Sequence, residues 1–222
     1  AYVEIANPIV NGEFGSFELQ PDGSVVVLTG SSSHGQGHHT AFAQIASDLT
    51  GIPMDRIQVR HGDTDEVPRG GGTGGSKSLQ IGGSAIWEAS EAAVARAKEI
   101  AAELLEANPD DVVLDVDRGE FSVVGTPALG ATWVDIAKFV QQGGGEPLRT
   151  EIDFQPVGAT FPFGVHLSVV EVDRETGEVT ILRHVACDDA GTLVNPLLVD
   201  GQAHGGIASG IAQALMEEFI YD

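Results

Sequence analysis

Cysteine is almost absent from this 222-residue sequence, in which Cys187 is the only one. A single cysteine excludes an internal disulfide, cannot ligate an iron–sulfur cluster by itself, and is compatible with a reducing compartment. No run approaches the ~20 apolar residues that a bilayer-spanning helix requires, and no basic-then-apolar leader opens the chain. The sequence therefore predicts a cytoplasmic protein without membrane insertion.

Positively charged residues are also scarce, with 11 lysines and arginines against 33 aspartates and glutamates and a net charge of −22. Such a surface repels phosphate backbones and anionic lipids, which argues against nucleic acid and membranes as partners. Hydrophobic residues make up 42% of the chain, enough for a core in one large domain or two small ones. Because the chain starts at Ala1 in a strand-like stretch and stops at Asp222, we expect a piece of a larger polypeptide.

Strand and helix signals are interspersed along the chain, which predicts an α+β fold of mixed β-sheets packed by helices. We expect a first α+β part over 1–141, a linker or surface excursion over 142–160, and a β-hairpin with a terminal helix over 161–222. The predicted strands are 2–5, 13–19, 24–28, 57–59, 112–116, 120–124, 161–171 and 179–187. The predicted helices are 38–50, 82–106, 132–140 and 195–217.

A polar turn, Ser31–Thr40, lies between the predicted strand at 24–28 and the helix that follows. Such a strand–turn–helix arrangement aims backbone N–H groups at an anion, because the first turn of a helix has unpaired donors and a partial positive charge. Gln36 lies between Gly35 and Gly37, and its amide can both donate and accept hydrogen bonds. The turn is therefore predicted to be a ligand-binding loop.

A second glycine-rich stretch, Pro68–Ser78, has five glycines in the six positions from 70 to 75. A flexible linker is one interpretation. The stretch lies between a strand and a long helix and also carries the hydroxyls of Thr73, Ser76 and Ser78. These features favour a second ligand loop, in which backbone N–H groups lie against the ligand. The neighbouring Asp63-Thr64-Asp65 could hold a ligand or cap its own turn.

The histidines raise the alternative of a metal-dependent hydrolase, because His34 and His38 are four residues apart and His39 follows. No acidic third ligand follows at usable spacing, so we predict no metal site, and a hydrolase would be recognised by stoichiometric zinc. His166 and His184 are predicted to be packed or partner-facing. The final predicted helix has glycines where helices seldom tolerate them, which indicates close approach of a backbone or a cofactor.

Several of these motifs, in this order, resemble one known family. The matching segments are Gly35-Gln36-Gly37-His38, Gly62-Asp63-Thr64-Asp65 with Pro68, Gly72–Ser78, Asp188-Asp189-Ala190-Gly191, Asn195-Pro196, and Asp200–Gly206 followed by Gly210 and Glu217-Glu218. They are similar to the molybdenum-cofactor-binding domain of the xanthine dehydrogenase/aldehyde oxidase family. Their sequences most resemble those of large subunits of aerobic carbon monoxide dehydrogenase. The resemblance covers essentially the whole chain. It implies that the chain is the C-terminal half of a molybdopterin-binding domain with an α+β fold.

The resemblance implies a molybdenum–molybdopterin cofactor, in bacteria usually the cytosine dinucleotide form. Gln36 matches the glutamine that contacts the molybdenum centre, and Gln202 matches one that hydrogen-bonds the pterin from the last helix. The other matched cofactor-binding positions are Gly35, Gly37, Thr73, Gly74, Gly75, Ser76 and Ser78.

The same resemblance implies water-dependent oxidation or hydroxylation of a small aldehyde, a heterocycle or carbon monoxide. The family's catalytic glutamate lies beyond residue 222, so no catalytic residue is assigned and the isolated chain is expected to be inert. The expected partners are the rest of the large subunit and subunits that carry iron–sulfur clusters and FAD, in an oligomer. The alternative is a stand-alone nucleotide-binding or assembly module of the same fold without redox activity.

Overall fold

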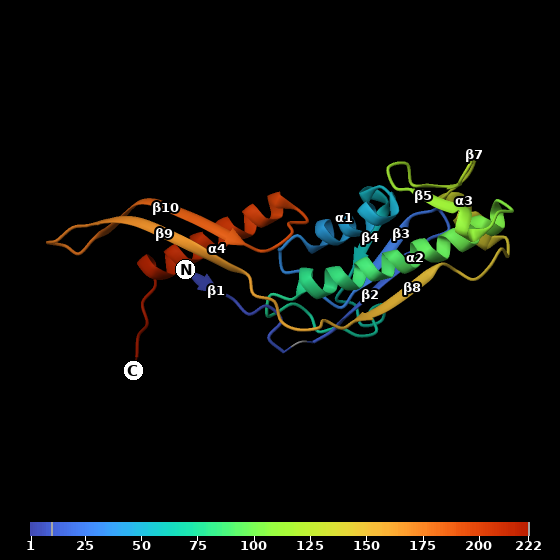
Figure 1. Cartoon of the computed structure of the whole chain (residues 1–222). Coiled ribbons are helices and arrows are strands. Elements are labelled where there is room, and N and C mark those ends of the chain that lie inside the picture. The colour runs from blue at the N-terminus through green and yellow to red at the C-terminus, as the bar shows by residue number, and fades with distance from the viewer. Residues whose placement is uncertain (10, 222) are drawn as a thin grey trace. The chain divides into compact units, whose positions relative to one another are not determined.

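The computed structural model describes residues 1–9 and 11–221, apart from the side chain of Pro127, and divides into two compact units. The larger unit is Asn7–Ala159, and the hairpin unit combines Ala1–Ala6 with Thr160–Asp222. Figure 1 labels the helices and strands of both units.

The larger unit contains a four-stranded sheet of order β4-β3-β2-β8 and a three-stranded sheet of order β5-β6-β7. Its strands are β2 (Glu13–Leu19), β3 (Val25–Thr29), β4 (Ile57–Arg60), β5 (Val112–Asp115), β6 (Glu120–Val123), β7 (Thr126–Thr132) and β8 (Arg149–Phe154). Its helices are α1 (His38–Thr50), α2 (Gly83–Leu104) and α3 (Trp133–Gln141), with short helical turns η1 (Met54–Arg56), η2 (Ser78–Gly82) and η3 (Pro109–Asp111).

One strand pair of the four-stranded sheet is parallel. β2 pairs antiparallel with both β3 and β8, whereas β3 and β4 are parallel, with Val25 opposite Ile57 and Leu28 opposite Arg60. Parallel strands require a crossover connection, and α1 provides it. Because parallel strands end at the same edge of a sheet, the segments that follow β3 and β4 begin side by side.

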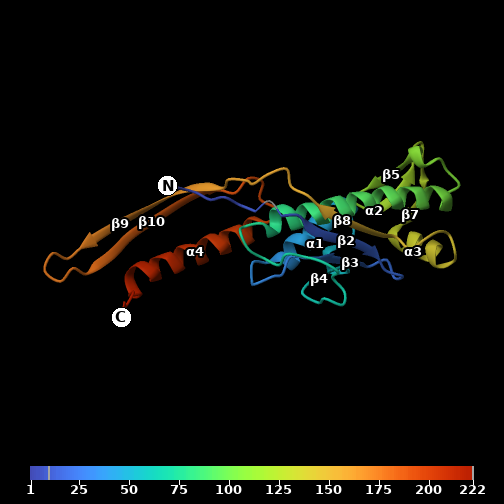
Figure 2. The ribbon, with the colours of Figure 1, turned by 90° about the horizontal axis from the view of Figure 1, so that it is seen from below.

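Helix α2 covers one face of this sheet, as Figures 1 and 2 show. Its buried stripe consists mainly of alanines, including Ala85, Ala89 and Ala93, so the helix approaches the strands closely. Gly15 on β2 makes this approach possible, because a Cβ there would lie 2.8 Å from the backbone of Ala85. On β8, the hydroxyl of Thr150 donates to the carbonyl of Ala89 at 2.7 Å.

The aromatic side chain of Trp133 joins α3 to the rest of the core. Its ring is buried against those of Phe17 and Phe121, and its Nε1 donates to the carbonyl of Thr50 at 2.8 Å. Helix α3 begins with a capping box, in which Thr132 and Asp135 exchange two hydrogen bonds. Local and long-range interactions therefore fix α3 together.

The hairpin unit consists of β1 (Tyr2–Val3), β9 (Phe163–Val172), β10 (Val179–Asp189) and α4 (Pro196–Met216). β9 and β10 form a long antiparallel hairpin, with β1 on the other edge of β9. Asn195 caps α4, since its side chain accepts from the backbone N–H of Leu198. Side chains of the hairpin and of α4 line one cavity of about 320 Å³.

The structure confirms the predicted α+β class of mixed sheets packed by helices. The unit boundaries lie at 6/7 and 159/160, and the stretch 142–160 that was predicted as a linker contains β8 in the four-stranded sheet. The sequence interpretation also omitted β7. Within the part of the chain that the structure describes, no helix has both the length and the hydropathy that crossing a bilayer requires.

Candidate cofactor-binding site

The two glycine-rich loops predicted to bind a ligand lie together in the larger unit. The first follows β3 and the second leads from β4 into η2, so the parallel pairing of β3 with β4 brings their starting points to one sheet edge. In open sheets with parallel strands, ligands bind at the carboxyl ends of the strands. The fold therefore places both loops where such a site is expected.

Direct contacts hold the loops against each other. The backbone N–H of Gly72 donates to the carbonyl of Gly30 at 3.0 Å, and the hydroxyl of Thr73 donates to the carbonyl of Ser32. A Cβ on Gly70 would lie 2.3 Å from Cα of Gly30, and one on Gly30 would lie 2.4 Å from Cα of Gly70. Only two glycines allow this approach of one backbone to the other.

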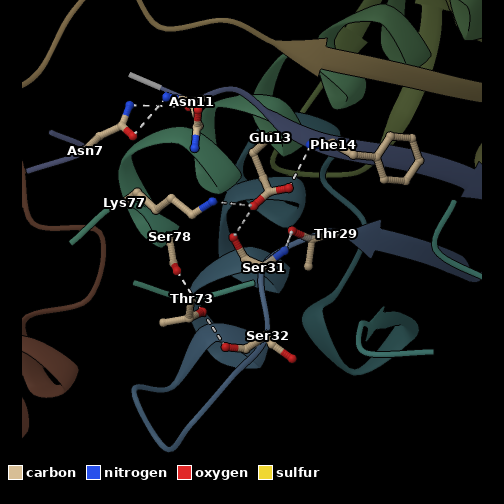
Figure 3. Close-up of polar contacts among 10 residues, drawn as sticks. All are labelled: Asn7, Asn11, Glu13, Phe14, Thr29, Ser31, Ser32, Thr73, Lys77 and Ser78. Carbon is tan, nitrogen blue, oxygen red and sulfur yellow. Dashed lines mark hydrogen bonds and ion pairs between the residues drawn. The ribbon is translucent and has the colours of Figure 1, made fainter. Parts of the chain in front are cut away.

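A buried ion pair lies next to the contact between the loops (Figure 3). The carboxylate of Glu13 accepts from the Ser31 hydroxyl at 3.1 Å and from the Phe14 backbone N–H at 3.1 Å. The ammonium of Lys77 lies 3.6 Å from the same carboxylate. The side chain of Glu13 is 0% exposed and that of Lys77 is 8% exposed. Glu13 on β2 thereby links the start of the first loop to the end of the second.

The hydroxyls of the second loop are also connected. Oγ of Ser78 lies 2.9 Å from Oγ1 of Thr73, whose single hydrogen is directed to Ser32, so Ser78 is the donor. Ser78 is buried at the start of η2, a π-helical turn, a feature common at functional sites. The carbonyl of Gly75 accepts from the Asn7 backbone N–H at 2.6 Å, and Ser76 is exposed with φ of 53°.

The first loop ends at an uncapped helix. Gly37 is the N-cap of α1 with φ of 81°, and neither a side-chain cap nor an acidic first-turn residue satisfies the helix start. Gly35 has φ of 102°, which favours glycine. The half-buried Gln36 folds back, since its Oε1 accepts from the His34 backbone N–H at 2.5 Å. Its NH₂ group is directed elsewhere, so the amide keeps donors for a ligand.

Several histidines lie near the start of α1. The sequence analysis named those of the first loop and did not name His61. His38 stacks on Phe42 with ring centroids 5.2 Å apart, and His39 lies beside His61, 4.8 Å between centroids. Burial, followed by repulsion from neighbouring histidines, lowers the pKa values of His38 and His61. Both imidazoles are therefore favoured in the neutral form.

The histidines of the first loop raised the alternative of a metal centre. Among residues 1–9 and 11–221, no three His, Cys, Asp or Glu side chains form a group that could hold a metal ion. The histidine-based hydrolase therefore has no support from the described residues. Asp63 accepts from the backbone N–H of Asp65 at 2.9 Å, so it caps its own turn, as one of the two interpretations had it.

The donor groups present fit an anionic, flat heterocyclic cofactor. The helix start supplies unpaired N–H groups, and no atom lies within 4 Å of the Cβ position of Gly35, Gly72 or Gly74, so their backbones are open to a ligand. A pyrophosphate binds such N–H groups and hydroxyls, and a pterin binds amide edges. The charge of Lys77 is already paired with Glu13, so the loops offer mainly neutral donors.

Of the nine predicted cofactor-binding residues, eight lie in these two loops. Gln202 lies instead on α4 of the hairpin unit, where it is exposed. Its contact with the pterin stays a prediction. Sequence reasoning did not assign Glu13, Lys77 or His61, and only the placement of Lys77 within the second loop gave a signal.

The fold and the two loops are those of a cofactor-binding α+β domain, and comparison with known families identifies which one. The chain belongs to the molybdopterin cofactor-binding domain family, whose model matches residues 3–222. The chain is 42% identical over 217 residues to the carbon monoxide dehydrogenase large chain of Hydrogenophaga pseudoflava, and the match covers 95% of this chain and 27% of that one.

Solved structures agree with this assignment. A copper- and molybdenum-containing carbon monoxide dehydrogenase matches all of this chain with a TM-score of 0.90 at 33% identity, over 29% of its own chain. Quinoline 2-oxidoreductase from Pseudomonas putida 86 matches with a TM-score of 0.87 at 30% identity, over 30% of its own chain. The chain thus spans less than a third of the length of these relatives.

Proposed function

We propose that the two loops of the larger unit bind the molybdopterin cofactor of a molybdenum hydroxylase large subunit, in its cytosine dinucleotide form. The observation that supports this proposal is the convergence of both loops at the ends of β3 and β4, tied by Gly30–Gly72 and Thr73–Ser32 hydrogen bonds. When bound, the molybdenum centre supplies the two-electron oxidation of a carbon centre with oxygen from water.

Each part of the loops has a distinct role in this proposal. The start of α1 and the open backbone of Gly74 bind the pyrophosphate, because both provide N–H groups without competing side chains, whereas the N–H of Gly72 already donates to Gly30. Gln36 and Gln202 bind the molybdenum centre and the pterin through their amides. The hydroxyls of Thr73 and Ser78 hold the second loop in its bound shape rather than acting as the first ligands of phosphate.

The reaction and the assembly are part of the same proposal. The relatives differ in the substrate that their names give, carbon monoxide and quinoline. We therefore propose a small aldehyde, heterocycle or carbon monoxide as the class of substrate, oxidised by a cytoplasmic oligomer that includes the remainder of the large subunit and iron–sulfur and flavin subunits. Because the family's base lies outside residues 1–222, the chain alone binds cofactor without turnover.

The cofactor can be measured directly. The chain is purified from a bacterial host that makes pterin dinucleotides, and molybdenum and the nucleotide released by acid hydrolysis are quantified. We expect molybdenum together with cytidine monophosphate, and a loss of both in Gln36→Ala and Gln202→Ala. The controls are Gln141→Ala at the exposed end of α3 and Gln213→Ala, exposed on the same helix as Gln202.

Three outcomes are distinguished by this measurement. Cytidine nucleotide without molybdenum would favour the alternative of a nucleotide-binding or assembly module. Absence of both from the wild-type chain would contradict the proposed function. Equal cofactor content in all four variants would contradict the assignment of the two glutamines while leaving the loops as the site.

A further inference from the structure

The hairpin unit carries a second group of polar and titratable side chains, which the proposed function does not use. Ser168 on β9 is directly opposite His184 on β10, and Gly164 is opposite Asp188. Since alternate residues of a strand point to the same face, His166 lies on that face as well. The register of the hairpin therefore places one serine, two histidines and one aspartate in a row.

These side chains form a continuous series of polar contacts. Oδ1 of Asp188 lies 3.0 Å from Nε2 of His166 and accepts from the Tyr2 hydroxyl at 3.0 Å. Gly164 leaves room for the carboxylate, because a Cβ there would lie 2.2 Å from Oδ1 of Asp188. The position of Asp188 is therefore fixed by a hydrogen bond from β1 and by the backbone beneath it.

The position of Asp188 determines the tautomer of His166. An aspartate is ionised at neutral pH and its oxygens then only accept, so Nε2 of His166 carries the proton. In the neutral ring, Nδ1 consequently carries a lone pair and no proton. This nitrogen lies 3.4 Å from Nε2 of His184.

His184 is oriented in the same way from its other side. Its Nδ1 lies 2.8 Å from Oγ of Ser168, and a hydroxyl can accept a hydrogen bond as well as donate one. When Ser168 accepts, Nε2 of His184 is also a lone pair. Two imidazole lone pairs then face each other, a repulsive arrangement that a shared cation relieves.

The separation of the two nitrogens suits a transition metal. Zinc binds imidazole nitrogen at ~2.0–2.1 Å in tetrahedral geometry, so two nitrogens on one tetrahedral edge are about 3.3–3.4 Å apart. The rings of His166 and His184 are inclined by 72° and do not stack. Metal-binding histidines usually donate their other N–H to a carboxylate or another polar group, the role that Asp188 has for His166 and that Ser168 has for His184 when its hydroxyl accepts.

We propose that Nδ1 of His166 and Nε2 of His184 bind a divalent transition-metal ion of the zinc type. Imidazole ligands favour zinc, copper and nickel over magnesium and calcium. The described residues offer these two ligands and no group of three, so water completes the coordination. Room for it exists, because both histidines border the cavity of about 320 Å³ whose other wall includes Gly206, Ile207 and Gly210 of α4. The site is independent of the proposed molybdopterin function.

The experiment titrates the purified metal-free chain with Zn²⁺ and records the imidazole ¹H–¹⁵N correlation spectrum. We expect Zn²⁺ to shift Nδ1 of His166 and Nε2 of His184. Because the larger unit has four histidines of its own, the spectrum rather than the stoichiometry assigns the site.

Variants measured by calorimetry test the ligands and their orientation. His166→Gln and His184→Gln should lose the binding event, and Asp188→Asn should weaken it by about tenfold or more, because Asp188 orients a metal-binding histidine. His204→Gln, which removes an exposed histidine from α4 of the same unit, should bind as the wild type does. Zn²⁺ shifts confined to the histidines of the larger unit, or no saturable binding by the wild-type chain, would overturn the proposal. The wild-type spectrum decides even where a variant does not fold.

Discussion

Substitution of Lys77 by methionine tests the ion pair that links the two glycine loops. The change leaves the Glu13 carboxylate, which is 0% exposed, without its counter-charge. Removing one partner of a buried pair costs ~3–5 kcal/mol, because the remaining charge is buried and unpaired. Glu13 keeps two hydrogen bonds, from Ser31 and Phe14, so we expect the lower end of this range, about 3 kcal/mol.

That loss is large for a protein of this size. Domains are stable by only ~5–15 kcal/mol, so the variant would lose a fifth or more of its free energy of unfolding. The assay is urea denaturation followed by circular dichroism, with an unchanged m-value as evidence that stability alone has changed. Lys138→Met is the matched control, since this lysine is exposed on α3 and its loss should cost less than ~0.5 kcal/mol.

A double variant separates the pair from the rest of the network. Glu13→Gln with Lys77→Met leaves no unpaired charge, and the glutamine carbonyl can still accept from Ser31. We therefore expect the double variant to be more stable than Lys77→Met alone, with a coupling energy of ~2–3 kcal/mol. A Lys77→Met variant as stable as Lys138→Met, or additive effects in the double variant, would show that the Glu13–Lys77 pair does not stabilise the unit.

Three further predictions concern the same unit. Burial lowers the pKa values of His38 and His61, so the stability that these side chains contribute is complete above pH ~6.5 and is lost as the pH falls through their folded-state pKa values. The free energy of unfolding should therefore drop between pH ~7.5 and ~5.5. The drop should be smaller in the double variant His38→Gln/His61→Gln. Gly30→Ala should destabilise the chain and abolish cytidine diphosphate binding, since its Cβ would lie 2.1 Å from Oε1 of Glu13. Gly74→Ala, whose Cβ would have nothing within 4 Å, should keep wild-type stability in urea denaturation. Thr132→Ala removes the capping box of α3 and should lower stability by ~1 kcal/mol in urea denaturation; an unchanged midpoint would show that the cap is dispensable.

Local sequence patterns predicted the elements that bear the site. The β-branched run at 24–28 and the apolar periodicity after His38 correspond to β3 and α1, because neither depends on distant residues. The stretch 142–160, which contains β8, was predicted as a linker or surface excursion because of the glycine run Gly143-Gly144-Gly145. Its strand conformation comes from pairing with β2, which is a long-range interaction.

The assembly of the site could be predicted only in part. Glycine and hydroxyl patterns, with the family resemblance, were enough to select both loops. Their contact depends on the parallel pairing of β3 and β4, and the link between them depends on Glu13, which lies in another strand. A glutamate in a strand has no local signal of burial, because its lysine partner is distant in the sequence. His61 was missed for the same reason, since only the fold brings it beside His39.

The central claim is that the two glycine-rich loops form one binding site. Hydrogen–deuterium exchange of the purified chain, with and without cytidine diphosphate, tests it most directly. We expect the ligand to slow exchange in residues 30–37 and 70–78 together, and both segments to lose this protection in Gly30→Ala. Protection of only one segment, or of neither, would contradict it.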